Sequence, residues 1–276
     1  VESVKGQAGS SDFNVSGSFR NLFAWMLTDN QSLDISASLQ SNNIHLDELM
    51  AKDLKATAPN SDTIYKLNFS EKLRLDLEIA IGQLQFKKFS ASALNGKLLL
   101  ESKTLITKEL DFNTAGGSVR LKGSIDNRQA NNLSINYDAI INDLDINKLF
   151  YEMGNFGQEV IIDNNLKGRV TAEITFRSKW TDRLELNENS IYAKSNITIE
   201  NGELINFKPM LALAGFLKGA DLKTVKFSTL TNTIEIKNRQ INIPLMEIKS
   251  SALDITASGQ HSFDNIVDYK LRLYLS

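Results

Sequence analysis

Apolar and polar residues alternate along most of the chain, which is the period-two pattern of β-strands with one dry face. The clearest run is 73–81, where every odd position is apolar and the even positions are Arg, Asp, Glu and Ala. The pattern predicts a mainly β protein in which one face of each strand is either buried or bound to something apolar. The apolar positions of these runs are Leu73, Leu75, Leu77, Ile79, Ile81, Val119, Leu121, Ile197, Ile199, Ile234, Ile236, Leu253 and Ile255.

Residues that tolerate positive φ lie between many of these runs and predict tight turns. The pairs are Asp29-Asn30, Asn95-Gly96, Asp126-Asn127 and Asn201-Gly202. Because two-residue turns join only antiparallel neighbours, we expect a mainly antiparallel sheet. Gly116-Gly117 is interpreted as a bulge or turn, since no helix start follows it.

Helical spacing is confined to three short segments, 47–54, 147–156 and 209–218. The last segment has Pro209 in its first turn and Gly219 just beyond its end, as a helix requires. Its side chains, Phe216 among them, are apolar nearly all round. We therefore interpret it as a plug or buried cap on the sheet.

Part of the chain repeats at an offset of 100 residues: the apolar and Asn positions of 33–50 recur in 133–150. Repeat-like units near 13–50, 117–156 and 253–276 suggest a sheet that grows by adding similar strands. Three prolines in the chain and no Pro- or Ser-rich linker favour a single continuous segment, 1–276.

Charge and composition exclude several classes of function. The chain has 276 residues, 42% hydrophobic and 23% charged, with 31 Lys and Arg against 33 Asp and Glu. A net charge of -2 without a basic run argues against nucleic acid as a partner. Because cysteine is absent, disulfides, thiolate chemistry and Cys-ligated zinc are excluded.

Candidate catalytic groups are sparse. The chain has two histidines, His45 and His261, and both lie among polar residues, as solvated surface histidines do. Asp143 and Asp145 lie two residues apart, an alternation that is common on exposed strands. No nucleophile elbow, phosphate loop or zinc-protease motif occurs, so we expect no enzyme activity, no metal site and no cofactor.

The predicted strands offer more apolar surface than the predicted helices can cover. About twelve strands of nine residues have a dry face on the order of 1,700 Å², whereas three short helices shield only about 450 Å². Soluble proteins rarely leave such an area bare. The pattern alone leaves two architectures open: a sheet closed as a sandwich or barrel, or a curled sheet that holds an apolar ligand.

Several segments resemble the AsmA-like family. The stretch Ala115-Gly116-Gly117-Ser118-Val119-Arg120-Leu121-Lys122-Gly123-Ser124-Ile125-Asp126 is similar to a family motif, and 199–210, 225–228 and 248–255 resemble its C-terminal region. The resemblance implies a periplasmic protein of the Gram-negative envelope, anchored in the inner membrane. It also implies a long curled antiparallel β-sheet that forms an open apolar groove, and a link to phospholipid transport toward the outer membrane.

These observations predict a non-catalytic, lipid-binding segment that holds phospholipid acyl chains along the apolar positions given above and Phe216. The run 269–275 looks like a strand cut short, so we expect a fragment that reaches membranes through segments outside it. The alternatives are a structural or adhesive β-sandwich and a scaffold that assists outer-membrane protein assembly by pairing at a sheet edge. The sequence indicates no particular protein partner.

Overall fold

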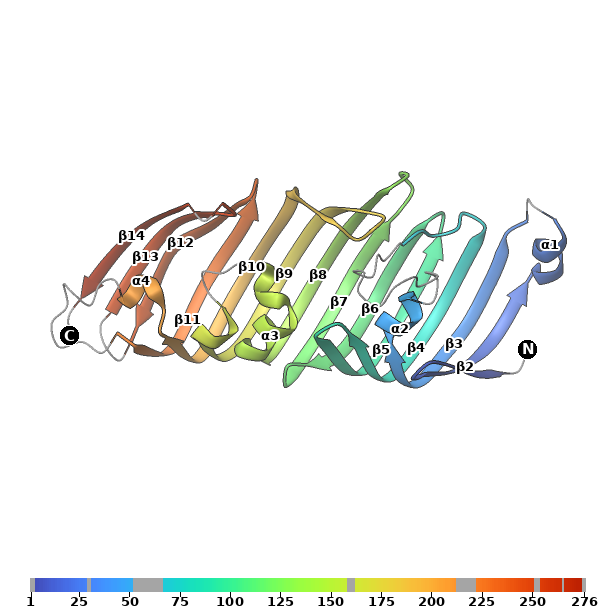
Figure 1. Ribbon diagram of the computed structural model, residues 1–276, viewed down its shortest axis with the longest axis horizontal. Coiled ribbons are helices and arrows are strands. Elements are labelled where there is room, and N and C mark those ends of the chain that lie inside the picture. Colours follow the sequence, from blue (N-terminus) through green and yellow to red (C-terminus); the bar gives the residue numbers. More distant parts are fainter. Residues whose placement is uncertain are drawn as a thin grey trace, which may run out of the picture. The chain divides into compact units, whose positions relative to one another are not determined.

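The protein is built on one mixed sheet of 14 strands that does not close into a barrel (Figure 1). The structure, a computed structural model, describes residues 3–28, 31–51, 67–157, 162–211, 222–250, 254–264 and 266–274. Strands account for 72% of it. The prediction of a mainly β fold with a few short helices is confirmed, and the alternative of two sheets packed as a sandwich is not observed in the described residues.

The strands follow one another across the sheet in chain order. The elements are β1 (Val4–Ala8), β2 (Ser11–Arg20), α1 (Leu22–Leu27), β3 (Leu33–His45), α2 (Leu46–Ala51), β4 (Leu73–Phe86), β5 (Phe89–Glu101), β6 (Thr104–Thr114), β7 (Gly117–Asp126), β8 (Asn132–Asp145), α3 (Ile146–Glu152), η1 (Gly154–Gly157), η2 (Asp163–Asn165), β9 (Leu166–Thr181), β10 (Leu186–Ile205), α4 (Lys208–Leu211), β11 (Thr224–Lys237), β12 (Gln240–Lys249), β13 (Asp254–Ser262) and β14 (Val267–Tyr274).

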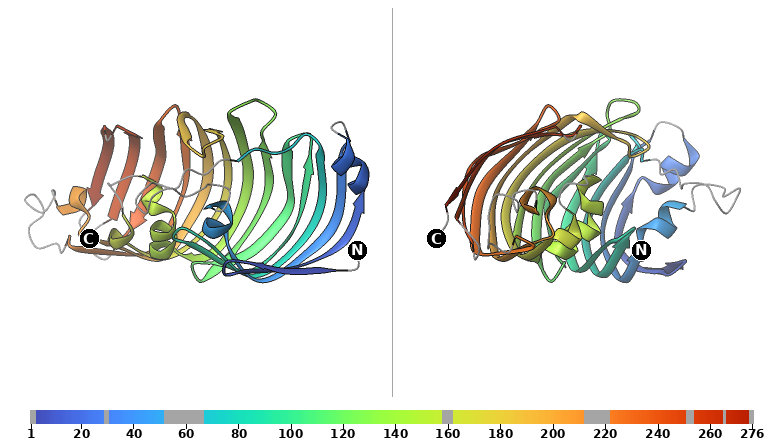
Figure 2. Two further views of the ribbon diagram at one scale, coloured as in Figure 1. Left: turned by 45° about the vertical axis from the view of Figure 1, so that its right-hand side comes forward. Right: turned by 60° about the vertical axis from the view of Figure 1, so that its left-hand side comes forward.

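The chain forms two compact units, and several central strands contribute to both. The first comprises Val1–Asn113, Arg120–Asp138 and Arg177–Glu188, and it contains β1 to β6 almost entirely. The second comprises Thr114–Val119, Ala139–Phe176 and Asn189–Ser276, and it contains β11 to β14. Within the first unit, β2 to β6 bend along their length (Figure 2).

One strand pair departs from the predicted antiparallel pairing. β3 and β4 are parallel, with Leu33 opposite Leu73 and His45 opposite Gln85. Parallel neighbours need a long crossover, and the chain between these two strands includes α2. The alternation of the two strands is the same for either direction, so the sequence pattern did not reveal the exception.

Three helices coincide with predicted segments, and α3, which is described to its end, stops four residues before the predicted end at 156. α2 and α3 lie within or beside the expected segments 47–54 and 147–156, and α4 begins the expected 209–218. Residues 52–54 and 212–218, including Phe216, lie outside the described residues. α1 was missed because its six residues, Leu-Phe-Ala-Trp-Met-Leu, are apolar throughout and show no helical period.

Several strands bend at a residue with positive φ, and we call each such position a crease. In the first unit Ala93 of β5 has φ 51°, and in the second Asp143 of β8 and Asn201 of β10 have φ 53° and 52°. The apolar positions change parity there, as from Ala91 to Leu94 in β5. A bulge-like residue of this kind bends the strand and keeps apolar side chains on one face beyond it.

The creases explain two wrong turn predictions. Asn95-Gly96 lies inside β5, where the Asn95 side chain donates a hydrogen bond to the Ala93 carbonyl oxygen at 2.8 Å. Asn201-Gly202 lies inside β10. By contrast, Asp126-Asn127 ends β7, and Gly116 with φ 75° forms the predicted turn before β7. Asp29-Asn30 lies outside the described residues.

Candidate functional site

The apolar side chains of the first unit form rows that run across neighbouring strands on one face. Residues directly opposite in a ladder point to the same face. Three rows cross β2 to β6: Phe19, Ile35, Leu75, Leu100 and Leu105; Gly17, Ala37, Leu77, Leu98 and Thr107; and Val15, Leu39, Ile79, Gly96 and Leu110. We call this surface the apolar face.

The opposite face of the same strands is charged. Lys97 lies 3.1 Å from Asp76, and Arg74 bridges toward Asp34 at 3.9 Å and Glu101 at 3.7 Å. These pairs are well exposed, so they contribute little to stability. Their consequence is that the sheet is amphipathic, with water on the charged side.

The apolar face remains partly exposed at its centre. Leu75, Leu77 and Leu98 are only half-buried, although each has strands on both sides. No second sheet packs on them within the described residues, and α2 lies beside β4. Three rows across five strands measure roughly 500 Å², although Ile79, Leu100 and Thr107 within them are buried. This size is comparable with the largest apolar patch of a typical soluble monomer, which is often functional.

The predicted residues of β4 all lie on this face. Leu73, Leu75 and Leu77 are half-buried, whereas Ile79 and Ile81 are buried. The structure therefore divides the predicted run into an accessible half and a packed half.

Five further predicted residues share one face of the second unit. Ile234 and Ile236 of β11 lie opposite Ser195 and Ala193 of β10, which share a face with Ile197 and Ile199. The ladder continues from Ile236 to Ile241 of β12. Ile255 lies on the same face through its pairing with Ile248.

The end of this face is packed rather than open. Met210 of α4 and Leu222 join a buried cluster with Val225, Phe227, Ile248, Ile255 and Ala257. The start of α4 therefore covers β11 to β13, as the plug interpretation of 209–218 predicted for its first residues. Leu253 and Phe216 lie outside the described residues.

Val119 and Leu121 lie two residues apart on β7 and therefore share a face, and Val119 is the more buried. They belong to different units, Val119 to the second and Leu121 to the first.

Sequence reasoning missed the polar residues that occupy apolar positions. In the first unit Thr107 is buried in the second row, and its hydroxyl lies 3.0 Å from the Tyr137 hydroxyl. Burial raises the pKa of Tyr137 above its ordinary value. In the second unit Ser195 and Asn232 are buried among the isoleucines of β10 and β11. A polar residue at an apolar position of the alternation was the available signal.

The histidine interpretation is wrong for His261. It is 7% exposed, lies between Ile241 and Val267 in the ladder, and contacts the Tyr269 ring edge to face at 6.5 Å. Its parity places it on the same face of β13 as Ile255, which the neighbouring Ser262 in the sequence concealed.

The paired aspartates have structural roles. Both oxygens of the Asp143 carboxylate accept hydrogen bonds from Arg169 at 2.7 Å, and this pairing lowers the pKa of Asp143. Asp145 caps α3 by accepting from the backbone of Asn147 and Lys148. The two carboxylates thus stabilise a crease and a helix start.

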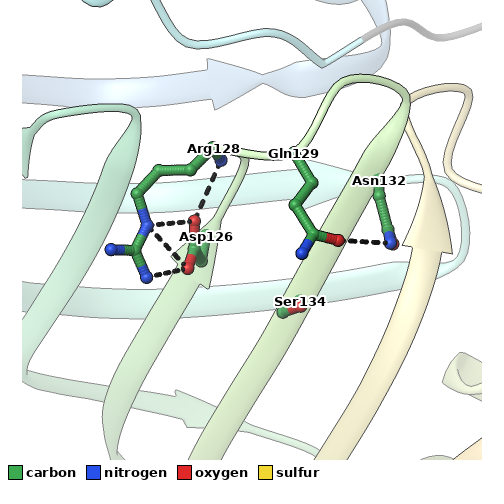
Figure 3. A pocket seen from close by; sticks show the side chains of 5 residues that line it. All are labelled: Asp126, Arg128, Gln129, Asn132 and Ser134. Atoms are coloured by element: carbon green, nitrogen blue, oxygen red, sulfur yellow. Dashed lines mark hydrogen bonds and ion pairs between the residues drawn. The ribbon is translucent and has the colours of Figure 1, made fainter.

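A polar pocket of 290 Å³ lies at the turn between β7 and β8 (Figure 3). Asp126 accepts from the guanidinium and backbone of Arg128, while Asn132 donates to Gln129. These side chains satisfy one another within the turn. The polar groups that line the pocket therefore serve to stabilise the loop.

An exposed apolar helix stands at the end of β2. In α1, Phe23 is 78% and Leu27 82% exposed, and the helix lies beside β3. Among the described residues, none of the helices has the length and apolarity that crossing a bilayer requires.

No protein-family model, curated protein or solved structure matches the chain.

Proposed function

We propose that the protein is a non-catalytic lipid-binding segment that holds phospholipid acyl chains along its apolar face. The observation that supports this most directly is the partial exposure of Leu75, Leu77 and Leu98 in the middle of a sheet. Side chains in a packed core are normally excluded from water. Leucines that stay half-buried at the centre of a contiguous apolar surface have the exposure expected of a binding surface.

The energetics favour a long hydrocarbon chain. Each buried methylene is worth about 0.8 kcal/mol, so ten of them offer about 8 kcal/mol before the cost of ordering the chain. Rows of Leu, Ile and Val side chains present only apolar atoms, which suits a ligand without directional requirements along most of its length.

The biological setting that we propose rests on the resemblance to AsmA-like proteins. On this basis we propose that the protein lies in the periplasm and is tethered to the inner membrane, where it would pass phospholipids between the two membranes and support envelope integrity. The structure that we propose for this role is a curled sheet with an open apolar groove.

A pair of substitutions on one strand tests lipid binding. Leu77→Asp puts a charge on the apolar face, and Ala80→Asp puts the same charge on the polar face of β4, where Ala80 is exposed. We expect native mass spectrometry of the purified wild-type chain to show bound phospholipid. Leu77→Asp should retain less than about a tenth of it, because desolvating an unpaired carboxylate costs several kcal/mol.

Ala80→Asp is the matched control and should bind as the wild type does. Thermal unfolding by circular dichroism establishes that both variants fold; if Leu77→Asp does not, Leu77→Gln replaces it. A wild-type chain free of lipid that also takes up none from vesicles would overturn the proposal.

A further inference from the structure

Helix α1, which lies beside β3 (Figure 1), exposes apolar side chains around most of its circumference. Its sequence, Leu-Phe-Ala-Trp-Met-Leu, contains no charged residue. Phe23, Met26 and Leu27 are 78%, 66% and 82% exposed, and Trp25 is 43% exposed. Because successive residues of a helix are about 100° apart, Phe23 and Trp25 point to opposite sides. A helix that packs on a protein normally has one apolar stripe and a polar back, and α1 has no polar back.

The size of α1 argues against a protein as the partner that covers it. Six helical residues are about 9 Å long, so one side of the helix offers roughly 100 Å². A stable protein–protein interface buries about 800 Å² on each partner. The strand ends next to α1 do not extend the apolar area, because they carry the exposed cations Arg20 and Lys72.

A bilayer surface suits a short helix that is apolar on opposite sides. The boundary between headgroups and acyl chains lies about 5–10 Å deep, which matches the length of α1, and it surrounds an inserted helix on every exposed side. Tryptophan is enriched at this depth, where its ring is partly apolar and its N–H is hydrated.

The charges at the base of α1 suit lipid phosphates. Arg20 directly precedes the helix, and the Lys72 carbonyl oxygen accepts from the Leu33 N–H at 2.7 Å, which places Lys72 at the start of β3. The acids beside these cations, Asp34 and Glu71, have other basic partners at 3.9 and 3.1 Å. Arginine and lysine both bind phosphate oxygens.

The middle of the α1 backbone is satisfied within the protein. The Trp25 N–H donates to the Asn21 carbonyl oxygen at 2.8 Å, and the Thr28 N–H and hydroxyl donate to the Ala24 carbonyl oxygen at 2.9 and 2.6 Å. Backbone groups that enter a membrane need such partners. The polar residues Asn21 and Thr28 flank the helix, so both ends would remain at the hydrated headgroups.

We infer that α1 docks the protein on a phospholipid bilayer by inserting its apolar side chains among the headgroups and the first part of the acyl chains. This goes beyond the proposed function, since α1 is separate from the apolar face and inserts whether or not that face holds lipid. Phe19, two residues before Asn21, begins the first row of the apolar face. Docking therefore brings the end of that row to the membrane surface.

Trp25 reports insertion directly. The chain has two tryptophans, so Trp180→Phe leaves Trp25 as the single fluorescent indole. We expect its emission to move to shorter wavelength when vesicles of phosphatidylcholine and phosphatidylglycerol are added. Lipids brominated near the headgroup end of the acyl chain should quench it more than lipids brominated near the methyl end. Emission that stays unchanged at saturating lipid would overturn the inference.

Co-sedimentation of the intact chain with the same vesicles tests which surface docks. Phe23→Ser/Leu27→Ser should lower partitioning at least about tenfold, because two side chains lose their transfer out of water. Leu245→Ser/Ile266→Ser is the matched control and should bind as the wild type does, since it removes two apolar side chains that are 66% and 70% exposed in the second unit. Circular dichroism establishes that both variants fold, and the Trp25 measurement needs no change in α1.

Two further results would overturn the inference. One is equal vesicle binding by the wild type and the α1 variant. The other is a dimer, seen by sedimentation equilibrium without vesicles, that the α1 variant abolishes, because a second copy would then cover the helix. Leu77→Asp keeps the two proposals distinguishable: it should lose acyl-chain binding and still dock on vesicles. Loss of docking in Leu77→Asp would show that the apolar face, and not α1, meets the membrane.

Discussion

At the scale of single residues, carboxylates tie neighbouring strands together by accepting hydrogen bonds from backbone amides or from arginine. Asp12 of β2 accepts hydrogen bonds from the backbone N–H groups of Asn42 and Asn43 at 3.0 and 2.8 Å. These donors hold the pKa of Asp12 below its ordinary value of 3.8. In the second unit Arg169 stabilises the crease at Asp143 by also donating to the carbonyl oxygens of Gly116 and Asp143.

The lowered pKa of Asp12 predicts a pH-dependent contribution to stability. A carboxyl with a folded pKa below its unfolded value stabilises the fold above the unfolded pKa, and the effect is lost as pH falls through the folded one. Asp12→Asn should therefore lower the free energy of unfolding at pH 7, and the difference should fade below about pH 4, near the ordinary value. Urea unfolding at a series of pH values measures this.

Asp268→Asn, which alters an exposed carboxylate of β14, is the control for the loss of one negative charge. A deficit of Asp12→Asn that is the same at pH 3 and pH 7 would show that the carboxylate charge contributes nothing to this contact.

At the scale of elements, the crease is the device that keeps a bent strand amphipathic. A side-chain period of two would turn apolar residues to the wrong face wherever an extra residue is inserted. In β8 the apolar positions pass from Ile141 to Leu144 across Asp143, and in β10 from Ile199 to Leu204 across Asn201. In both strands the change of parity accompanies the positive φ.

Ala93 makes the crease of β5 testable, because alanine at φ 51° is strained. Ala93→Gly should stabilise the protein by up to about 1 kcal/mol, against the usual cost of glycine in a strand. Ala91→Gly is the matched control two residues away. Ala91 is 2% exposed, so this change should destabilise by about 1 kcal/mol or more. Chemical denaturation of both variants gives the two signs, and a loss of stability in Ala93→Gly would contradict the crease geometry.

At the scale of the whole molecule, strands are neighbours in space when they are neighbours in sequence. Such a sheet resembles a linear array, in which each strand depends on the two beside it. We therefore expect amide hydrogen exchange to be graded, with β1 and β14, at the two ends of the strand order, exchanging earliest. Interior pairs such as β4 and β5 should be protected longest. Mass spectrometry of exchanged peptides measures the gradient, and simultaneous loss of protection in all strands would contradict it.

Local sequence determined the strands and their dry face, because the alternation of a strand is a property of consecutive residues. The run 73–81 therefore revealed β4 without knowledge of its partners, and the Gly116 turn was equally local. The 33–50 and 133–150 repeat corresponds to β3 with α2 and to β8 with α3.

Tertiary structure decided what depends on partners distant in sequence. The parallel pairing of β3 with β4, the burial of His261 and the choice of one sheet over a sandwich each follow from which strand lies beside or above another. The polar pair of Ser195 and Asn232 belongs with these, since 37 positions of sequence numbering separate two side chains that the ladder makes neighbours. Alternation determines which face a side chain takes, but only the fold determines what covers that face.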